Sequence, residues 1–182
     1  MEFERTRLPG VVRIRPRVFE DERGFFMESW QERKFSAAGI EAHFVQDNHS
    51  RSARGTLRGL HYQSRMPQGK LVRVTRGAVF DVVVDIRHSS PAFGCWEAHE
   101  LSAQNRHMLW VPPGFAHGFL ALADDTELLY KCTAYHAPEL ERAIAWNDSD
   151  LAIQWPLHAG EVPLLSQKDA AAPSFGHAEC LP

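Results

Sequence analysis

Short runs of apolar, often β-branched residues dominate the middle of the chain, and turns rich in Pro, Gly, Asn and Asp separate them. Runs of this length and spacing predict antiparallel β-strands. The predicted strands cover residues 71–75, 78–86, 95–101, 106–111, 118–122 and 127–133. Strands do not alternate with helices, and the sequence has no glycine-rich phosphate loop and no internal repeat. The pattern therefore favours a mainly β jelly roll, built as a barrel or a sandwich.

The two ends of the chain carry weaker signals. Pro9 and Pro16 confine the first apolar segment to an edge strand or to irregular geometry. Residues 31–38 predict one short helix, because Gly39 follows where a helix C-terminal glycine belongs. Residues 44–50 begin as a strand but turn polar, and we expect the strand to dissolve there. From residue 148 helix potential is weak, so we expect a tail that wraps the barrel.

The predicted strand at residues 78–86 has two different faces. Alternate positions from Phe80 to Ile86 are apolar, whereas Asp81 and Asp85 share the other face with two valines. Carboxylates among valines are typical of the wall of a polar cavity. They are equally typical of a half-solvated outer face, and the sequence leaves both interpretations open.

The composition fits a single globular domain over residues 1–182, with 44% hydrophobic and 24% charged residues. A net charge of -3 with scattered Lys and Arg lacks the electrostatic footprint of a nucleic-acid-binding protein. No apolar run approaches the roughly 20 residues that span a bilayer, and the first residues do not resemble a signal peptide. We therefore expect a cytoplasmic protein with neither nucleic-acid nor membrane partners.

Candidate chemistry gathers between residues 56 and 72. Arg58, His61 and Lys70 place two cations and an imidazole among small and apolar neighbours. Alternate side chains of a strand share a face, so Arg58 and His61 need a bend at Gly59 to point the same way. Such a bend costs least at glycine. The set predicts a pocket for an anionic substrate with an acidic proton.

Ten histidines raise the question of a metal site. Metal-binding cupins often use a His-x-His pair, a following carboxylate and a later His. Here Tyr62 and Gln63 follow His61, and His117 is the one candidate from the second half of such a site, so a three-ligand site is hard to build. The cysteines at 95, 132 and 180 are odd in number and unpatterned, which indicates reduced thiols and no zinc site.

His61 is the sharper candidate as a general base, because a neutral imidazole accepts a proton near pH 7. The alternative is a structural histidine bonded to a backbone carbonyl, and the nearby cations Arg58 and Lys70 favour the base. Tyr130 lies in an apolar strand, where it either presents its phenol to a cavity or only packs. Arg23 and Arg58, each beside a glycine, suit phosphate contacts or are ordinary surface arginines.

Blocks in the same order along nearly the whole chain carry a family resemblance. They are residues 18–26, 44–50, 57–63, 70–72, 80–87, 109–119, 144–148 and 165–169, with Tyr130, Tyr135 and Glu141. The chain resembles the dTDP-4-dehydrorhamnose 3,5-epimerases, nucleotide-sugar enzymes of the cupin superfamily. The resemblance implies a jelly-roll homodimer that acts on a dTDP-sugar with no metal and no organic cofactor.

The resemblance also implies roles for individual residues. His61, paired with Asp169, is expected to remove the protons at C3 and C5 of a 4-keto sugar, and Tyr130 to return protons from the opposite face. Lys70 is expected to hold the C4 oxygen as it becomes an enolate. The residues expected to contact the substrate are Arg23, Glu28, Gln46, Asp47, Asn48, Arg58, Lys70, His117, Glu141 and Lys168.

The expected reaction converts dTDP-4-dehydro-6-deoxy-D-glucose to dTDP-4-dehydro-L-rhamnose by inversion at C3 and C5. Inversion at C3 alone, as in antibiotic-sugar pathways, is the alternative, since those relatives keep the same base and acid. A non-catalytic sugar-binding cupin is a second class, and the presence of His61, Tyr130 and Asp169 counts against it. A metal-dependent cupin oxygenase is a third, and bound metal in the purified protein would reveal it.

Overall fold

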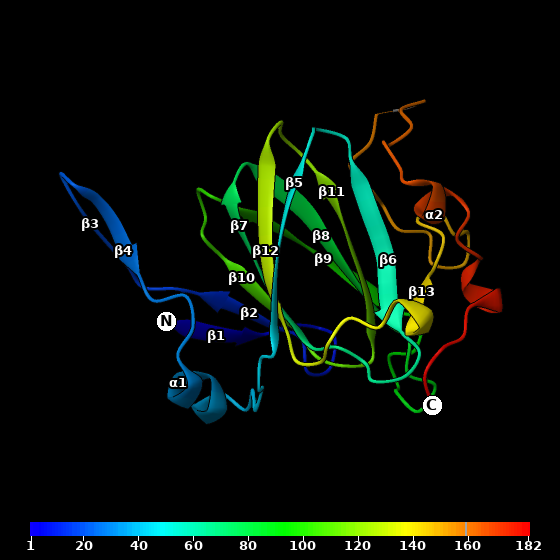
Figure 1. Cartoon of the computed structure of the whole chain (residues 1–182), viewed down its shortest axis with the longest axis horizontal. Coiled ribbons are helices and arrows are strands. Elements are labelled where there is room, and N and C mark those ends of the chain that lie inside the picture. The colour runs from blue at the N-terminus through cyan, green and yellow to red at the C-terminus, as the bar shows by residue number, and fades with distance from the viewer. Residues whose placement is uncertain (159) are drawn as a thin grey trace.

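Two antiparallel sheets packed face to face form the body of the computed structural model, which describes residues 1–158 and 160–182 (Figure 1). The six-stranded sheet has the order β1-β2-β10-β7-β12-β5, which are Glu2–Arg5, Val12–Arg15, Met108–Val111, Lys70–Arg76, Thr126–Cys132 and Gln46–Ser52. The five-stranded sheet has the order β13-β6-β11-β8-β9, which are Glu141–Ala143, Leu57–Gln63, Phe115–Ala121, Ala78–Asp85 and Trp96–Ser102. The described strands do not close into a barrel, so the expected mainly β fold is confirmed as a sandwich.

Two short helices flank the sheets. Helix α1, Glu32–Ala37, confirms the predicted helix, and Gln31 caps it by accepting a hydrogen bond from the Lys34 N–H. Helix α2, Gln167–Ala170, lies in the tail, where the sequence indicates only weak helix potential, and the Ser166 side chain caps it. Single 3₁₀ turns lie at Pro138–Leu140 and Phe175–His177. In the part of the chain that the structure describes, no helix has the length and apolarity to cross a membrane.

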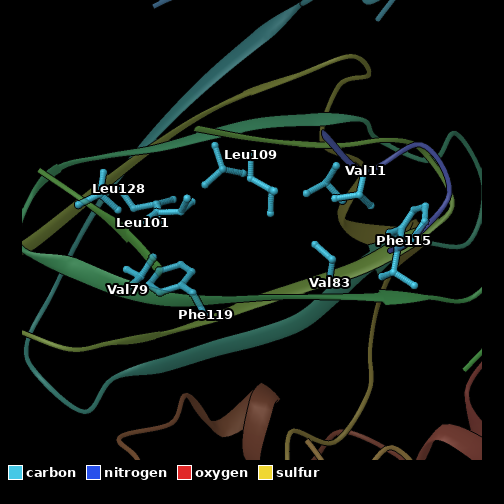
Figure 2. Close-up of a cluster of buried hydrophobic side chains, with 12 residues drawn as sticks. Val11, Val79, Val83, Leu101, Leu109, Phe115, Phe119 and Leu128 are labelled. Atoms are coloured by element: carbon cyan, nitrogen blue, oxygen red, sulfur yellow. The ribbon is translucent and has the colours of Figure 1, made fainter. Parts of the chain in front are cut away.

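The main hydrophobic core lies between the two sheets (Figure 2). Leu109 and Leu128 reach it from the six-stranded sheet, while Val79, Val83 and Phe119 reach it from the five-stranded sheet. A second cluster covers the outer face of the five-stranded sheet, where the C-terminal segment packs on β8 and β11. The tail therefore buries the sheet face that solvent would otherwise reach, as the sequence predicted.

Burial on both faces decides between the two interpretations of β8. Val82 and Val84 contact the tail cluster, whereas Val79 and Val83 lie in the core between the sheets. Because side chains alternate along a strand, Asp81 and Asp85 also point between the sheets, and both are fully buried. The half-solvated outer face is therefore wrong, and both carboxylates lie in the interior between the sheets.

Three strand predictions need correction. β2 pairs with both β1 and β10, so it is internal, and the prolines only flank it. β5 does not dissolve after Val45, because it pairs residue for residue with β12 from Gln46 to Ser52. β11 begins at Phe115, before the predicted start at residue 118, so His117 lies within the strand. In each case hydrogen bonding to a neighbouring strand outweighs the local signal.

A β-hairpin of β3, Val18–Asp21, and β4, Gly24–Met27, extends away from the sandwich (Figure 1). Its phenylalanines are largely exposed, with Phe19 at 50%, Phe25 at 56% and Phe26 at 70%. Arg106 links the hairpin to the body through an ion pair with Glu20 and a stacking contact over the Phe25 ring. The hairpin therefore presents a run of aromatic side chains to solvent.

Candidate active site

A cavity of about 250 Å³ opens between the two sheets at one end of the sandwich. Residues from both sheets and from the loops beside them line it. They are Gln46, Asn48, His61, Tyr62, Gln63, Gln68, Lys70, Tyr130, His136 and Glu141. The predicted base, acid and cation therefore share one cavity.

Strand register explains which residues of the six-stranded sheet reach the cavity. Tyr130 of β12 lies opposite both Asn48 of β5 and Val72 of β7, and Val72 belongs to the core between the sheets. Residues opposite one another share a face, so Tyr130 and Asn48 point inward. Lys70 lies two residues from Val72 on the same face, and its Nζ is 5.9 Å from the centre of the Tyr130 ring.

A bulge in β6 places His61 on the matching inner face of the other sheet. His61 lies opposite His117, and Arg58 lies opposite Phe119, so three steps along β6 match two steps along β11. His117 and Phe119 share a face, and therefore Arg58 and His61 do as well. The bend that the sequence predicted at Gly59 is confirmed.

Gly59 is required because the backbones of β6 and β11 meet there. Its φ is +129°, and a Cβ added to it would lie 2.5 Å from Cα of Gly118 and 2.9 Å from the carbonyl oxygen of His117. Gly59→Ala is therefore expected to lower the free energy of unfolding by more than about 2 kcal/mol and to displace His61. Denaturant unfolding measures this.

Gly55→Ala is the matched control, because Gly55 also has a positive φ, of +79°, but has nothing within 4 Å of an added Cβ. It should cost only the backbone strain, about 1 kcal/mol. Equal losses in the two variants would contradict the claim that close approach of β11 selects glycine at position 59.

His61 forms a hydrogen bond with Asp169, a residue of helix α2. The His61 Nε2 lies 2.5 Å from Asp169 Oδ1, and the Ser166 hydroxyl donates to Asp169 Oδ2 over 2.9 Å. Burial acts to raise the pKa of Asp169, but the hydrogen bonds from His61 and Ser166 and the charge of His61 outweigh it, so the pKa is lowered. An ionised carboxylate keeps the Nε2 proton in place and leaves Nδ1 as the proton acceptor.

Burial shifts the pKa values of Lys70 and Tyr130, which face His61, in opposite directions. Desolvation lowers the pKa of Lys70, although nearby Cys132, Asp81 and Glu141 act to raise it. Desolvation raises the pKa of Tyr130, and Cys132 and Glu141 act in the same direction. The phenol is therefore protonated at neutral pH and able to act as an acid.

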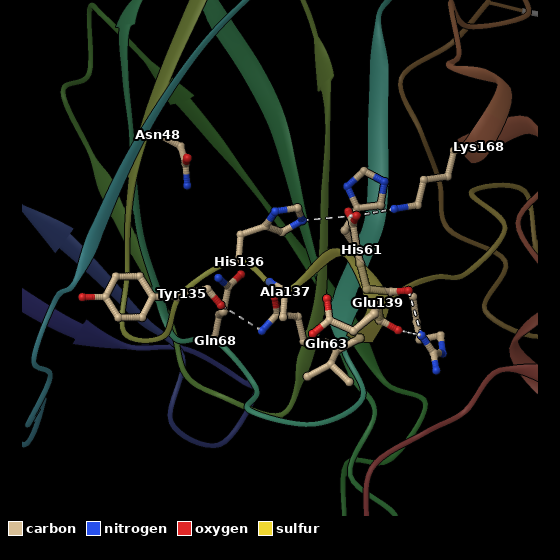
Figure 3. Close-up of polar contacts among 12 residues, drawn as sticks. Asn48, His61, Gln63, Gln68, Tyr135, His136, Ala137, Glu139 and Lys168 are labelled. Carbon is tan, nitrogen blue, oxygen red and sulfur yellow. Dashed lines mark hydrogen bonds and ion pairs between the residues drawn. The ribbon is translucent and has the colours of Figure 1, made fainter.

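Glu141 forms a second charged group at the edge of the cavity. It accepts from Lys168 in a close ion pair and lies 3.3 Å from His136 Nε2 (Figure 3). Burial acts to raise the pKa of Glu141, but these two contacts outweigh it and lower the pKa. Glu141 lies directly opposite Gln63 of β6, which places both side chains on the inner face.

Two other residues predicted to contact substrate, His117 and Arg58, differ in how deeply they are buried. His117 is buried, and its Nε2 contacts both oxygens of Asp81 at 2.9 and 3.0 Å. Arg58 is exposed, and its guanidinium donates to the Ser52 hydroxyl and to the Arg51 carbonyl. The two thus lie beside the cavity without lining it.

Three predicted substrate residues are not brought to the cavity of their own chain. Asp47 alternates with Gln46 and Asn48, points to the outer face and pairs with Lys131. Arg23 lies at the tip of the hairpin, 85% exposed, and contacts Asp21. Glu28 follows the hairpin and pairs with Lys34.

Sequence reasoning missed several residues at the cavity. Gln68 and His136 come from loops, where periodicity carries no information about direction. Cys132 was interpreted only as a reduced thiol, yet it lies opposite Lys70 and receives a hydrogen bond from Asn48 over 3.6 Å. Its position two residues from Tyr130 in a strand was the available signal. Across residues 1–158 and 160–182, no three His, Cys, Asp or Glu side chains are grouped to hold a metal.

Comparison with known proteins identifies the family. A family model described as dTDP-4-dehydrorhamnose 3,5-epimerase matches residues 5–177. The curated enzyme of that name from Pseudomonas aeruginosa is 55% identical, with the alignment covering 100% of both chains.

Solved structures agree with the sequence relatives. The dTDP-6-deoxy-D-glucose-3,5-epimerase of Legionella pneumophila, in complex with dTDP-4-keto-L-rhamnose, is 50% identical and superposes with a TM-score of 0.93 over 97% of this chain and 93% of that one. A 3'-monoepimerase of Streptomyces bikiniensis bound to dTDP-quinovose is 35% identical, with a TM-score of 0.87 over 94% and 86%. The chain belongs to the dTDP-4-dehydrorhamnose 3,5-epimerase family.

Proposed function

We propose that this protein inverts C3 and C5 of dTDP-4-dehydro-6-deoxy-D-glucose to give dTDP-4-dehydro-L-rhamnose. The observation that carries the proposal is the arrangement of base and acid. His61 and Tyr130 point into one cavity from opposite sheets, and Lys70 lies beside Tyr130. Inversion at carbon needs a proton acceptor and a proton donor on two sides of a ring, and this cavity provides them.

The reaction begins when Nδ1 of His61 takes the proton from the carbon beside the ketone. The C–H electron pair moves into a C=C bond, and the carbonyl electrons move to the C4 oxygen, so that an enolate forms. A cation at that oxygen stabilises the intermediate, by roughly 3–4 kcal/mol per donor in comparable sites. The ammonium of Lys70 is the cation that fits.

The second half of the reaction returns a proton from the other side. The Tyr130 hydroxyl donates its proton to the carbon, the enolate collapses to the ketone, and the configuration is inverted. Solvent then reprotonates the phenolate and removes the proton from His61. Electrons return to the same carbonyl, so we propose that no redox cofactor takes part.

We also propose that the enzyme works as a homodimer in the cytoplasm. Arg23 and Glu28 match the family pattern yet lie on or beside the hairpin, away from their own cavity. A second subunit can receive the hairpin and so bring these residues to a nucleotide-sugar. The three cysteines are all free, which fits a reducing compartment.

Phe26→Asp is expected to abolish dimerisation and to reduce activity at least tenfold, since a charge at this exposed aromatic residue opposes burial in an interface. Light scattering after size-exclusion chromatography measures the mass. Val162→Asp is the matched control, because Val162 is 75% exposed but lies in the tail. A dimeric, active Phe26→Asp protein would contradict the role of the hairpin.

Incubation of the chelator-treated protein with dTDP-4-dehydro-6-deoxy-D-glucose in deuterated water tests the proposed reaction. NMR should show deuterium at C3 and at C5. Label at C3 alone would assign the protein to single epimerisation, the activity named for the Streptomyces relative. Label at neither carbon would overturn the epimerase proposal for this substrate and favour a sugar-binding cupin.

A further inference from the structure

Asp81 and Asp85 share one face of β8 and are both 0% exposed, but their partners differ. Asp85 receives a guanidinium from Arg87 and a hydroxyl from Ser90, which neutralise and satisfy it. Among the described residues, Asp81 is bonded to His117 alone, through Nε2. A fully buried carboxylate is costly unless a nearby charge compensates it.

The register places Asp81 close to the catalytic strands. Asp81 lies opposite Phe119 on β11, and His117, two residues along, lies opposite His61 on β6. Asp81 therefore faces the space between the sheets, where Lys70 points inward from β7. Among the described residues, neither an arginine nor a lysine forms an ion pair with Asp81, whose polar contacts are those with His117 Nε2.

Lys70 needs a nearby negative charge to stay protonated. Taking an ammonium out of water favours its neutral form, and desolvation is the largest influence on Lys70, lowering its pKa. A neutral amine would lose the charge that stabilises an enolate. The titratable or charged groups that face Lys70 from the strands packed around it are Tyr130 and Cys132 on β12, His61 on β6, His117 on β11, Asp81 on β8 and Glu141 on β13.

Few of these groups can carry a negative charge near pH 7 and so counter the effect of desolvation on the pKa of Lys70. Burial raises the pKa of the Cys132 thiol and of the Tyr130 phenol, which keeps both neutral near pH 7. Glu141 is engaged by the ammonium of Lys168. Asp81 is the remaining carboxylate in the set, and its charge acts to raise the pKa of Lys70.

We infer that Asp81 is a positioning residue whose buried carboxylate holds Lys70 in its ammonium form, ready to meet the enolate oxygen. This inference rests on the proposed function for its catalytic meaning, but the charge coupling itself is a property of the free protein. Asp81 thereby acts through Lys70 and needs no contact with the sugar.

Titration of Lys70 by NMR tests the coupling without substrate. Protein labelled with ¹³C at lysine Cε would show separate signals for Lys34, Lys70, Lys131 and Lys168, and Lys70→Arg identifies the relevant one. In Asp81→Asn the titration of Lys70 should move down by about one pH unit or more. In Asp85→Asn, the matched control on the same buried face, it should stay in place.

The pH profile of kcat/KM gives the second readout. Removing a charge that raises the pKa of Lys70 lets the ammonium deprotonate at lower pH, so the alkaline limb should shift downward in Asp81→Asn. Asp81→Glu, which keeps the charge, should restore most of the wild-type profile. The acid limb should stay unchanged.

Several outcomes would overturn the inference. They are an unmoved Lys70 titration in Asp81→Asn, an equal shift in Asp85→Asn, or failure of both Asp81→Asn and Asp81→Ser to fold while Asp85→Asn folds. The last result would make Asp81 a folding requirement. A shifted titration in a protein that labels neither C3 nor C5 would instead keep the coupling and reject the proposed function.

Discussion

His61→Asn is expected to reduce deuterium exchange at C3 and C5 together, by about 10²–10⁴-fold. Asparagine keeps an N–H that can donate to Asp169 but has no basic atom to accept a proton. Because one base faces the cavity from β6, exchange at both carbons should fall in parallel. Initial rates of label incorporation, followed by NMR at each carbon, measure the effect.

His99→Asn is the matched control for this variant. His99 is also paired with a carboxylate, Glu97, at 3.1 Å, but on β9 at the far edge of the five-stranded sheet. Its exchange rates should equal those of the wild type. Loss of exchange at one carbon only in His61→Asn would show that a second base serves the other carbon.

Tyr130→Phe is expected to separate exchange from inversion. His61 remains, so the substrate should still take up deuterium, but with its original configuration, because the same base returns the label. Product with inverted centres should form about 10²–10⁴-fold more slowly, since the proton donor on the opposite side is missing. Coupling constants in the NMR spectrum distinguish the two configurations.

Tyr62→Phe provides the comparison for the loss of a phenol. Tyr62 lies next to His61 in β6, but its side chain packs with the tail on the outer face, and burial raises its pKa to about 12. This variant should invert C3 and C5 at the wild-type rate. If Tyr130→Phe inverted the sugar normally, another group would have to be the acid.

The linear sequence was sufficient for much of the fold. Short apolar and β-branched runs between turns located β7, β8, β9 and β12 to within one or two residues, because residues of these types fill the buried positions of a sheet. The glycine after α1 located the end of that helix. Matching blocks also identified the family, since many short segments in the same order are far more specific than any one of them.

The sequence also indicated which residues take part in the chemistry of the site. Side-chain chemistry favoured His61 as a general base beside the cations Arg58 and Lys70. The family resemblance, and not local chemistry, implied that Lys70 meets the enolate oxygen and that Tyr130 is the acid. The bend at Gly59 followed from the need to turn Arg58 and His61 to one side. The bend at Gly59 and the choice of His61 as base depend only on local geometry and on side-chain chemistry, which neighbouring residues already determine.

Contacts between distant segments required the tertiary structure. The resemblance implied that Asp169 pairs with His61, but only the structure shows how the pair forms across 108 positions of sequence: the tail folds back and α2 docks beside β6. Which face of β8 points inward depends on what covers the other face, and the tail decides that. Alternation shows that two faces differ, but only packing shows which one is buried, and so only the fold revealed that Asp81 points inward and Asp47 outward.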